Sequence, residues 1–137
     1  MIEVTTALPY PDEYNALRFC AGWPTYDTDA AKVGLRNSLH TVSVRDAGVL
    51  IAFGRVVGDS VITFYIQDVI VIPERQSQGH ARTVMEHLMC YIRAAAAPGA
   101  VVGLMSARGV EGLYEKFGFV SRPHGETMGA GMVLPEV

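Results

Sequence analysis

The segment VITFYIQDVIVI, residues 61–72, constrains the fold more than any other part of the sequence. It is rich in β-branched residues and apolar at both odd and even positions, which favours an extended strand. One face of that strand carries Ile62, Phe64, Ile66, Ile70 and Ile72, and the other carries Val61, Tyr65, Val69 and Val71. A strand that is buried on both faces lies in the middle of a sheet covered by helices. The segment therefore predicts the central strand of an α/β domain.

Asp68 is the one acidic residue in this apolar run. A buried carboxylate is costly without a partner, so Asp68 needs a structural or chemical reason to be there. Strand alternation places its side chain on the opposite face from that of Gln67. We expect a structural role, in which Asp68 is hydrogen-bonded to a loop or a helix end, and we keep a catalytic role as the alternative.

Hydrophobic periodicity and turn residues predict the remaining elements. The expected strands are 2–4, 40–44, 49–57, 100–105, 119–122 and 128–134, and the expected helices are 11–19, 29–39, 81–97 and 109–118. Asp29 is the expected N-cap of the second helix. The chain has 137 residues, half of them apolar, which fits one domain spanning 1–137. The pattern predicts an α/β fold of the α+β type.

Composition excludes several classes of function. The formal net charge is −3, with 11 Lys and Arg against 14 Asp and Glu, so we expect no nucleic-acid partner. No apolar run reaches about 18 residues, and the N-terminus has no signal-peptide pattern, so we expect a cytoplasmic protein that does not enter a membrane. Cys20 and Cys90 are expected to be reduced, partly buried thiols. No two histidines have the spacing of metal ligands, and we expect no metal.

The polar segment PERQSQGHAR, residues 73–82, follows the central strand and leads directly into a helix. A helix N-terminus carries unpaired N–H groups and partial positive charge, which suits a phosphate group. Gly79 allows close approach of the backbone to a ligand, and Arg75 and Arg82 offer charge-assisted contacts. The segment contains neither G-x-x-x-x-G-K-[ST] nor G-x-G-x-x-G, which argues against nucleotide hydrolases and nicotinamide-binding folds.

Two segments resemble the signatures of the GNAT superfamily of N-acetyltransferases. DVIVIPERQSQGHARTVMEHLMCYI resembles its acyl-CoA-binding segment, whose loop reads Gln/Arg-x-x-Gly-x-Gly/Ala, and SARGVEGLYEKFGFVSRP resembles its second signature, a short helix with Tyr ahead of Gly-Phe. The element order also matches along essentially the whole chain. Ser77 and His80 depart from the family pattern, but both keep their backbone N–H groups. The resemblance implies a GNAT fold, with a central mixed, mostly antiparallel sheet of six to seven strands flanked by about four helices.

The resemblance also implies where acetyl-CoA, the cosubstrate, binds. The pantetheine arm is expected to lie like an extra strand along Val69, Ile70, Val71 and Ile72, and the pyrophosphate is expected at Gln76, Ser77, Gln78, Gly79, His80, Ala81, Arg82 and Thr83. Tyr114 matches the tyrosine that serves relatives as the general acid for the departing thiolate. Because the family transfers the acetyl group directly, no nucleophilic cysteine is required.

The general base and the acceptor site are less well defined by the resemblance. Relatives often carry a Glu near positions 65 and 67, where this chain has Tyr65 and Gln67, neither of which takes up a proton at neutral pH. Deprotonation of the amine then uses water ordered by Gln67, or no dedicated base. Phe19, Trp23, Tyr26 and Tyr65 are candidate walls of the acceptor pocket, with Arg18 and His124 as further polar contacts.

Three functions follow from the resemblance. The first is acetylation of a primary amine on a small molecule by direct attack on acetyl-CoA. The second keeps the fold and the cosubstrate but acetylates a protein N-terminus or a lysine. The third is a module that binds acyl-CoA as a sensor without turnover. Because many relatives are dimers, the resemblance also implies a homodimer.

Overall fold

Five strands form one mixed sheet in the computed structural model, which describes residues 1–137. The strands are β1 (Ile2–Thr5), β2 (His40–Asp46), β3 (Val49–Gly58), β4 (Thr63–Val71) and β5 (Val101–Leu104). Their order in the sheet follows the sequence, and every pair is antiparallel except β4 and β5, which are parallel. The long apolar segment is thus an inner strand, as its two apolar faces predict.

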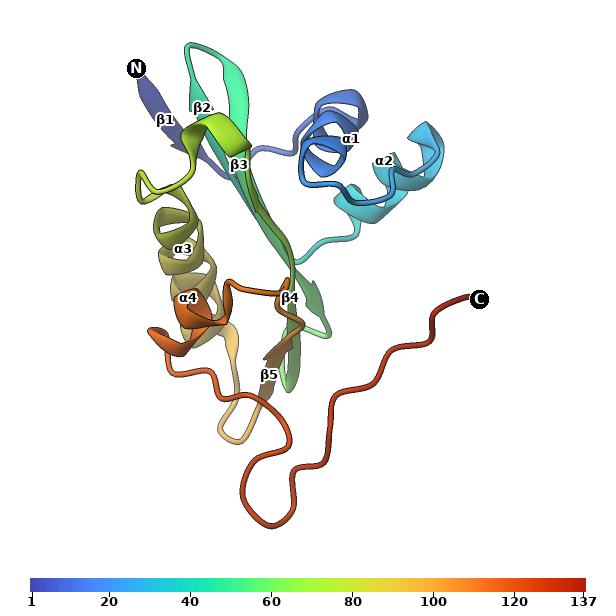
Figure 1. Ribbon diagram of the computed structural model, residues 1–137, viewed down its shortest axis with the longest axis vertical. Coiled ribbons are helices and arrows are strands. Elements are labelled where there is room, and N and C mark those ends of the chain that lie inside the picture. Colours follow the sequence, from blue (N-terminus) through green and yellow to red (C-terminus); the bar gives the residue numbers. More distant parts are fainter. The chain divides into compact units, whose positions relative to one another are not determined.

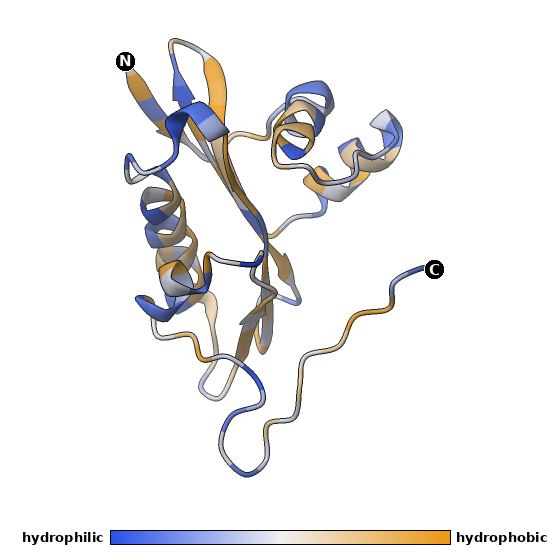
Figure 2. Cartoon of the chain, viewed as in Figure 1, coloured by the Kyte–Doolittle hydropathy of each residue, from blue (hydrophilic) through white to orange (hydrophobic).

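Helices cover both faces of this sheet (Figure 1). The helices α1 (Pro11–Cys20) and α2 (Thr28–Arg36) lie on one side, and α3 (His80–Ala95) lies on the other. On the α1 side the core consists of Tyr14, Leu17, Ala31, Leu35, Leu50, Phe53 and Ile70. The buried stripe of α3 consists of Val84, Met85, Leu88, Met89 and Ile92. Figure 2 shows the matching hydropathy, with apolar colour along the strands and polar colour on the outer turns of the helices.

The chain divides into two compact units, Met1–Leu104 and Met105–Val137. The first unit contains the whole sheet, the first three helices and a short 3-10 helix, η1 (Pro73–Arg75). The second contains the short helix α4 (Glu111–Glu115) and the C-terminal segment. Each helix predicted from the sequence is present, with bounds that differ by at most three residues.

The N-cap of α2 is Asp27, and the prediction of Asp29 was wrong. Asp27 Oδ2 accepts hydrogen bonds from the backbone N–H groups of Asp29 and Ala30, at 3.1 and 3.3 Å. An N-cap side chain satisfies the amides two and three residues further on, so it must precede the first helical residue, which is Thr28. Asp27 and Asp29 both lie near the start of α2, and the helix begins at Thr28, so only Asp27 precedes it.

The structure has five strands rather than the predicted six to seven, because residues 119–122 and 128–134 form no strand. The C-terminal segment has one isolated bridge, in which the backbone N–H of His124 donates to the carbonyl of Met128 at 3.0 Å. Met132, Val133 and Leu134 are largely exposed. Alternating apolar residues specify the two faces of a strand, but a strand also needs a neighbour for its backbone hydrogen bonds. The sequence pattern contains no information about that neighbour.

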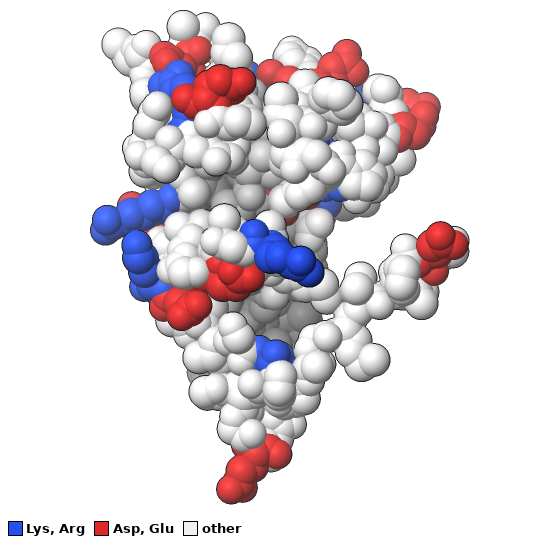
Figure 3. Space-filling view, viewed as in Figure 1, with Lys and Arg blue, Asp and Glu red and all other residues white.

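Cys20 and Cys90 are free thiols and both are exposed, so the expectation of partial burial was wrong. Each lies on the outward side of its helix, where the apolar character of a thiol does not decide burial. No helix is both long and apolar enough to cross a membrane. On the face drawn in Figure 3, basic and acidic side chains are interspersed.

Ser43 and Thr41 allow a matched test of hydrogen bonding in the core. Ser43 is fully buried in β2 and its Oγ has no hydrogen-bond partner, whereas Thr41 Oγ1 donates to the carbonyl of Thr6 at 3.0 Å. We expect Ser43→Ala to leave the free energy of unfolding unchanged or to raise it by up to about 1 kcal/mol, and Thr41→Val to lower it by about 1 kcal/mol. Urea denaturation measures both. A large loss in Ser43→Ala would mean that its hydroxyl has a partner.

Gly79 and Gly34 allow the same comparison for backbone conformation. Gly79 precedes α3 with φ of 85°, whereas Gly34 lies inside α2, and an added Cβ would meet no atom within 4 Å at either position. Ala at position 79 would lower the free energy of unfolding by about 1 kcal/mol, because a left-handed backbone is unfavourable for a residue with a Cβ. Ala at position 34 would raise it by about as much, because Ala has a higher helix propensity than Gly. Gly79→Ala should therefore lower the denaturation midpoint and Gly34→Ala should raise it. Equal effects of the two variants would contradict the left-handed conformation at position 79.

Candidate functional site

The loop before α3 presents a row of unpaired backbone N–H groups. The amide of Gln76 donates to the carbonyl of Pro73 at 3.4 Å, and the next amide that donates to a backbone carbonyl is that of Thr83, which bonds to the carbonyl of Gly79 at 3.0 Å. The amides of residues 77–82 make no hydrogen bond with the protein. They lie at the start of a 16-residue helix, where the helix dipole adds partial positive charge. This arrangement suits a phosphate or another anion.

Backbone conformation shapes this row of amides. Gly79 has φ of 85° and Ser77 has φ of 62°, so two residues in the turn adopt the left-handed region. Ser77 stands where the family pattern often has Gly, and the positive φ is a physical reason for that preference. His80 has a buried Nε2 without a hydrogen-bond partner at the first position of the helix. The departures at 77 and 80 therefore leave the amides in place.

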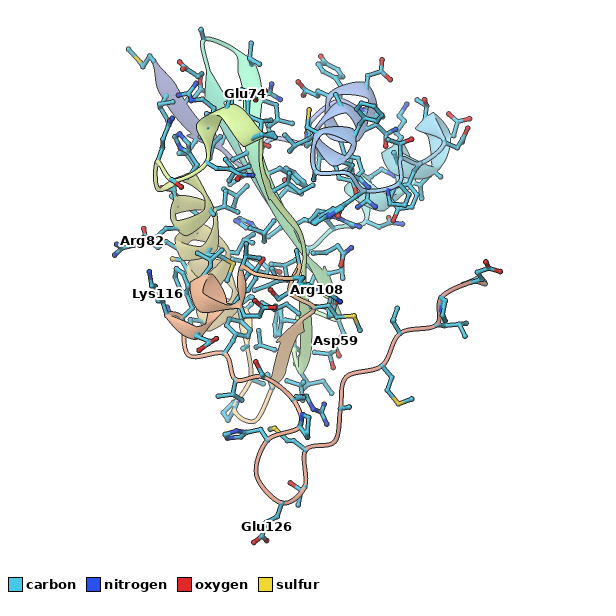
Figure 4. The ribbon with its side chains drawn as sticks, in the orientation of Figure 1. Asp59, Glu74, Arg82, Arg108, Lys116 and Glu126 are labelled. Atoms are coloured by element: carbon cyan, nitrogen blue, oxygen red, sulfur yellow. The ribbon has the colours of Figure 1, made fainter.

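Side chains hold the loop against the sheet. Gln76 Nε2 donates to the carbonyl of Val71 at 3.2 Å, and Arg75 donates to Gln78 Oε1 at 3.1 Å. Arg75 also forms an ion pair with Asp46 at the end of β2, at 2.8 Å. Arg82 forms an ion pair with Glu86 one turn further along α3, and most of its side chain is exposed (Figure 4). The loop thus has its own support, and Arg82 is accessible to a ligand.

The strand β4 leaves part of its outer edge unpaired. It pairs with β5 over Thr63–Ile66, whereas its pairing with β3 continues to Val71. Beyond Ile66 the side of β4 that faces away from β3 therefore has no ladder partner in the sheet. Its backbone groups there can bond to an extended ligand, in the way that a peptide adds to a sheet edge.

A β-bulge interrupts β4 at the same place. Arg55 of β3 lies opposite Gln67 and Phe53 lies opposite Ile70, so that the single residue Gly54 faces both Asp68 and Val69. Asp68 has φ of 58°, which Asp tolerates better than most residues. An extra residue in one strand switches the faces of the side chains that follow it.

The bulge corrects two sequence predictions about β4. Phe64 contacts the ring of Tyr91 in α3, whereas Ile70 packs against the core under α1, so these two residues do not share a face. Gln67 and Asp68 do share one, because Arg55, opposite Gln67, reaches Asp68 on the α1 side. Strict alternation fails here because it assumes a strand without a bulge.

Asp68 is the centre of a buried charged cluster. Its side chain is fully buried, and it accepts hydrogen bonds from Tyr14 Oη at 2.5 Å, from Arg18 Nη1 at 2.6 Å and from Arg55 Nε at 2.9 Å. The neighbouring carboxylate and, more strongly, burial raise the pKa of Tyr14, which keeps the phenol protonated as a donor. Both carboxylate oxygens are therefore occupied by the protein, which supports the structural role expected for Asp68.

The predicted acceptor residues lie in different surroundings. Arg18 is buried, with its guanidinium 4.5 Å from the ring centre of Tyr26 and 5.5 Å from that of Trp23. Trp23 is partly buried against the α1 core. Phe19 is 76% exposed on α1, which makes it the least enclosed of the candidates. Tyr65 is partly buried in β4, opposite Val57. The structure thus brings Arg18, Trp23 and Tyr26 together.

The remaining predicted residues belong to the second unit. Tyr114 of α4 is buried, and its ring makes an edge contact with that of Phe119. Burial raises the pKa of Tyr114, so its phenol is protonated at neutral pH. His124 is exposed and forms the isolated bridge to Met128. No three His, Cys, Asp or Glu side chains gather as a group that could hold a metal ion.

Sequence reasoning missed Tyr14 and Arg55 as partners of Asp68. Tyr14 and Arg18 are four residues apart in a helix, so their side chains point from the same face. That spacing, together with an unexplained Asp in an apolar strand, was the available signal. Arg55 lies in the neighbouring strand, and its register depends on the bulge, which the sequence did not indicate.

Comparisons with known proteins agree with the geometry. Residues 37–121 match the model of the acetyltransferase (GNAT) domain. Two relatives are GCN5-related N-acetyltransferase 1, chloroplastic, of Arabidopsis thaliana, 34% identical over 83% of this chain and 58% of that protein, and serotonin N-acetyltransferase 2, chloroplastic, of Oryza sativa subsp. japonica, 30% identical over 74% and 52%. The chain spans little more than half the length of these two relatives.

A solved structure is similar over the whole chain. It is the probable acetyltransferase SA2161 from meticillin-resistant Staphylococcus aureus, a protein of unknown function, with 35% identity, a TM-score of 0.91 and coverage of 99% of this chain and 100% of that one. The matching domain model covers more than half of the sequence, and the fold agrees throughout. The chain therefore belongs to the GNAT family of acetyltransferases.

Proposed function

We propose that the protein transfers the acetyl group of acetyl-CoA to a primary amine of a small molecule. The observation that carries the proposal is the row of unpaired amides at residues 77–82, at the start of α3 in a GNAT domain. Acetyl-CoA is the general cosubstrate of this family. The donors present fit its pyrophosphate, because amides that point outward from a helix N-terminus are hydrogen-bond donors with partial positive charge.

The contacts expected for the cosubstrate extend from the loop to β4. The amides of Ser77, Gln78, Gly79, His80 and Ala81 would hold the pyrophosphate, and Arg82 and Thr83 would add side-chain donors. Val69, Ile70, Val71 and Ile72 would border the pantetheine arm along the edge of β4 that β5 leaves unpaired. The carbonyl of Val71 already accepts a hydrogen bond from the Gln76 side chain, which links the two parts.

The chemistry requires a neutral amine and a proton for the departing sulfur. Acetyl-CoA supplies the acyl group as a thioester. A carbon–nitrogen bond forms between the amine and the acetyl carbonyl carbon, the carbon–sulfur bond breaks, the amine loses one proton and the thiolate gains one. We assign the proton that the departing thiolate gains to Tyr114, whose buried phenol is protonated at neutral pH. Direct transfer leaves Cys20 and Cys90 without a catalytic role.

Removal of the proton from the amine is assigned to water beside Gln67. Gln67 is partly buried in β4 on the α1 side, with its Nε2 3.5 Å from Asp68 Oδ1. Asp68 is a poor candidate for a base that contacts the substrate, because Tyr14, Arg18 and Arg55 already occupy its oxygens. Its contribution is better described as structural.

A small amine is favoured as the acceptor over a protein. Aromatic side chains near Arg18, namely Trp23 and Tyr26, offer flat apolar surface for a compact substrate, with Tyr65 and Phe19 as further walls. The rice relative carries a small aromatic amine, serotonin, in its name, which supports this choice. The second candidate is a protein or peptide amine, and the third is an acyl-CoA sensor. A homodimer and a cytoplasmic location complete the proposal.

A thiol-release assay with acetyl-CoA tests the proposed function. Panels of arylalkylamines, polyamines, amino acids, aminoglycosides and peptides should give turnover with at least one small amine and none with peptides. Calorimetry should show that coenzyme A binds, and that a bulky residue in place of Gly79 weakens this binding, because the left-handed backbone at this position is strained with any side chain and the turn then shifts its amides. Binding without turnover on any panel would favour the sensor, and absence of binding would remove the assignment.

Tyr114→Phe tests the proton donor. The substitution keeps the buried ring and removes the hydroxyl, so we expect kcat to fall by ~10²-fold while the affinity for coenzyme A changes little. Phe119→Leu is the matched control, because it alters the ring contact of Tyr114 and leaves the hydroxyl in place. An unchanged kcat in Tyr114→Phe would take the proton-transfer role away from this residue.

A further inference from the structure

The cluster of Asp68, Tyr14, Arg18 and Arg55 has no direct part in the proposed chemistry, although it is the most deeply buried charged group in the protein. It joins three elements, since Tyr14 and Arg18 come from α1, Arg55 from β3 and Asp68 from β4. A buried ion cluster contributes little net stability, because the cost of removing the charges from water offsets their attraction. Its geometry is demanding, however, since three donors must meet one carboxylate.

The carboxylate is attached to the one residue of β4 whose backbone is left-handed. Asp68 has φ of 58° and forms the bulge with Val69 opposite Gly54. A left-handed residue inside a strand costs about 1 kcal/mol or more unless its surroundings hold it. Three hydrogen bonds, from Tyr14, Arg18 and Arg55, reach the side chain of this residue, with a longer contact of 3.5 Å from Gln67 Nε2.

The bulge lies where the edge of β4 becomes free. The last pair between β4 and β5 is Ile66 with Leu104, and the bulge begins two residues later. Bulges bend a strand and increase its twist, which separates it from a straight neighbour. This bulge also places Asp68 on the α1 side, beside Gln67, whose Nε2 lies 3.5 Å from Asp68 Oδ1. The conformation of Asp68 thus coincides with the start of the free edge and with the change of face after Gln67.

We infer that Asp68 is a positioning residue for acetyl transfer. The hydrogen bonds from Tyr14, Arg18 and Arg55 to its carboxylate, called the lock below, hold the bulge in β4. The bulge in turn keeps the edge of β4 beyond Ile66 free for the cosubstrate. The inference rests on the proposed function, since the free edge is where the pantetheine arm is expected. It adds a role for three side chains that do not touch the reacting atoms. The lock acts through the backbone of β4.

Three substitutions at position 68 separate the lock from simple backbone preference. Asp68→Gly and Asp68→Asn both tolerate a left-handed backbone, whereas Asp68→Ala does not, and none of the three carries the carboxylate. The lock predicts that kcat/KM for acetyl-CoA falls about tenfold to a hundredfold in all three variants, because the acyl group is misplaced. Asp12→Asn, at an exposed position in the first turn of α1, is the charge-matched control and should keep the wild-type value.

Hydrogen exchange reports the bulge independently of activity. The amide of Ile72, beyond the bulge, donates to the carbonyl of Ile51, whereas Ile66, before the bulge, lies opposite Val56. Loss of the lock should speed exchange at Ile72 by at least about tenfold relative to Ile66 through local opening, whereas global destabilisation would speed both equally. Tyr14→Phe removes one donor without unpairing a charge, and it should show the same selective change if the Asp68 variants fail to fold.

Two results would overturn the inference. The first is a value of kcat/KM for Asp68→Gly within about twofold of wild type. It would mean that the bulge needs only a residue that adopts a left-handed backbone at position 68, and not the carboxylate. The second is equal acceleration of exchange at Ile66 and Ile72, which would reduce the cluster to general stability. If the wild-type protein does not bind coenzyme A, the proposed function fails, and the exchange comparison alone then decides whether the carboxylate holds the bulge.

Discussion

The arrangement of the first unit depends on the hydrogen bonds and ion pairs of the Asp68 carboxylate. This carboxylate accepts hydrogen bonds from a helix and from the neighbouring strand at a depth where water does not reach. An unpaired charge at that depth would cost several kcal/mol, so α1 and β3 must deliver their donors to the same point. The position of α1 over the sheet and the register of β3 against β4 are therefore linked through one side chain.

This link connects the two halves of the candidate site. The bulge at Asp68 ends the regular part of β4, and the strand then leads through η1 into the loop whose amides face outward. The loop is held in turn by Arg75, which pairs with Asp46 of β2, and by Gln76, which donates to the carbonyl of Val71. Hydrogen bonds to strand ends and loop side chains thus fix the direction of the free amides before any ligand arrives, which reduces the cost of ordering them.

Ser77 shows how a departure from the family pattern can be tolerated. Its φ of 62° lies in the region that Gly adopts without cost, and the chain pays for a side chain there. The side chain at position 77 nevertheless leaves the backbone amides of the turn unpaired. A departure at this position therefore removes no backbone donor from the candidate site.

The sequence by itself determined the four helices and the five strands of the sheet, and two of its segments indicated the family. The apolar run at residues 61–72 required an inner strand of the sheet, because it is apolar at odd and even positions alike. The spacing of Val84, Met85, Leu88, Met89 and Ile92 required a helix packed on one side. Gly79 ahead of that helix predicted an anion site, which is part of the proposed function. Only the tertiary structure decided the faces of β4 after Gln67, the partners of Asp68 and the absence of strands at 119–122 and 128–134. A bulge, a buried ion pair and a strand pairing each depend on a second segment distant in the sequence, and local pattern does not specify which segment that is.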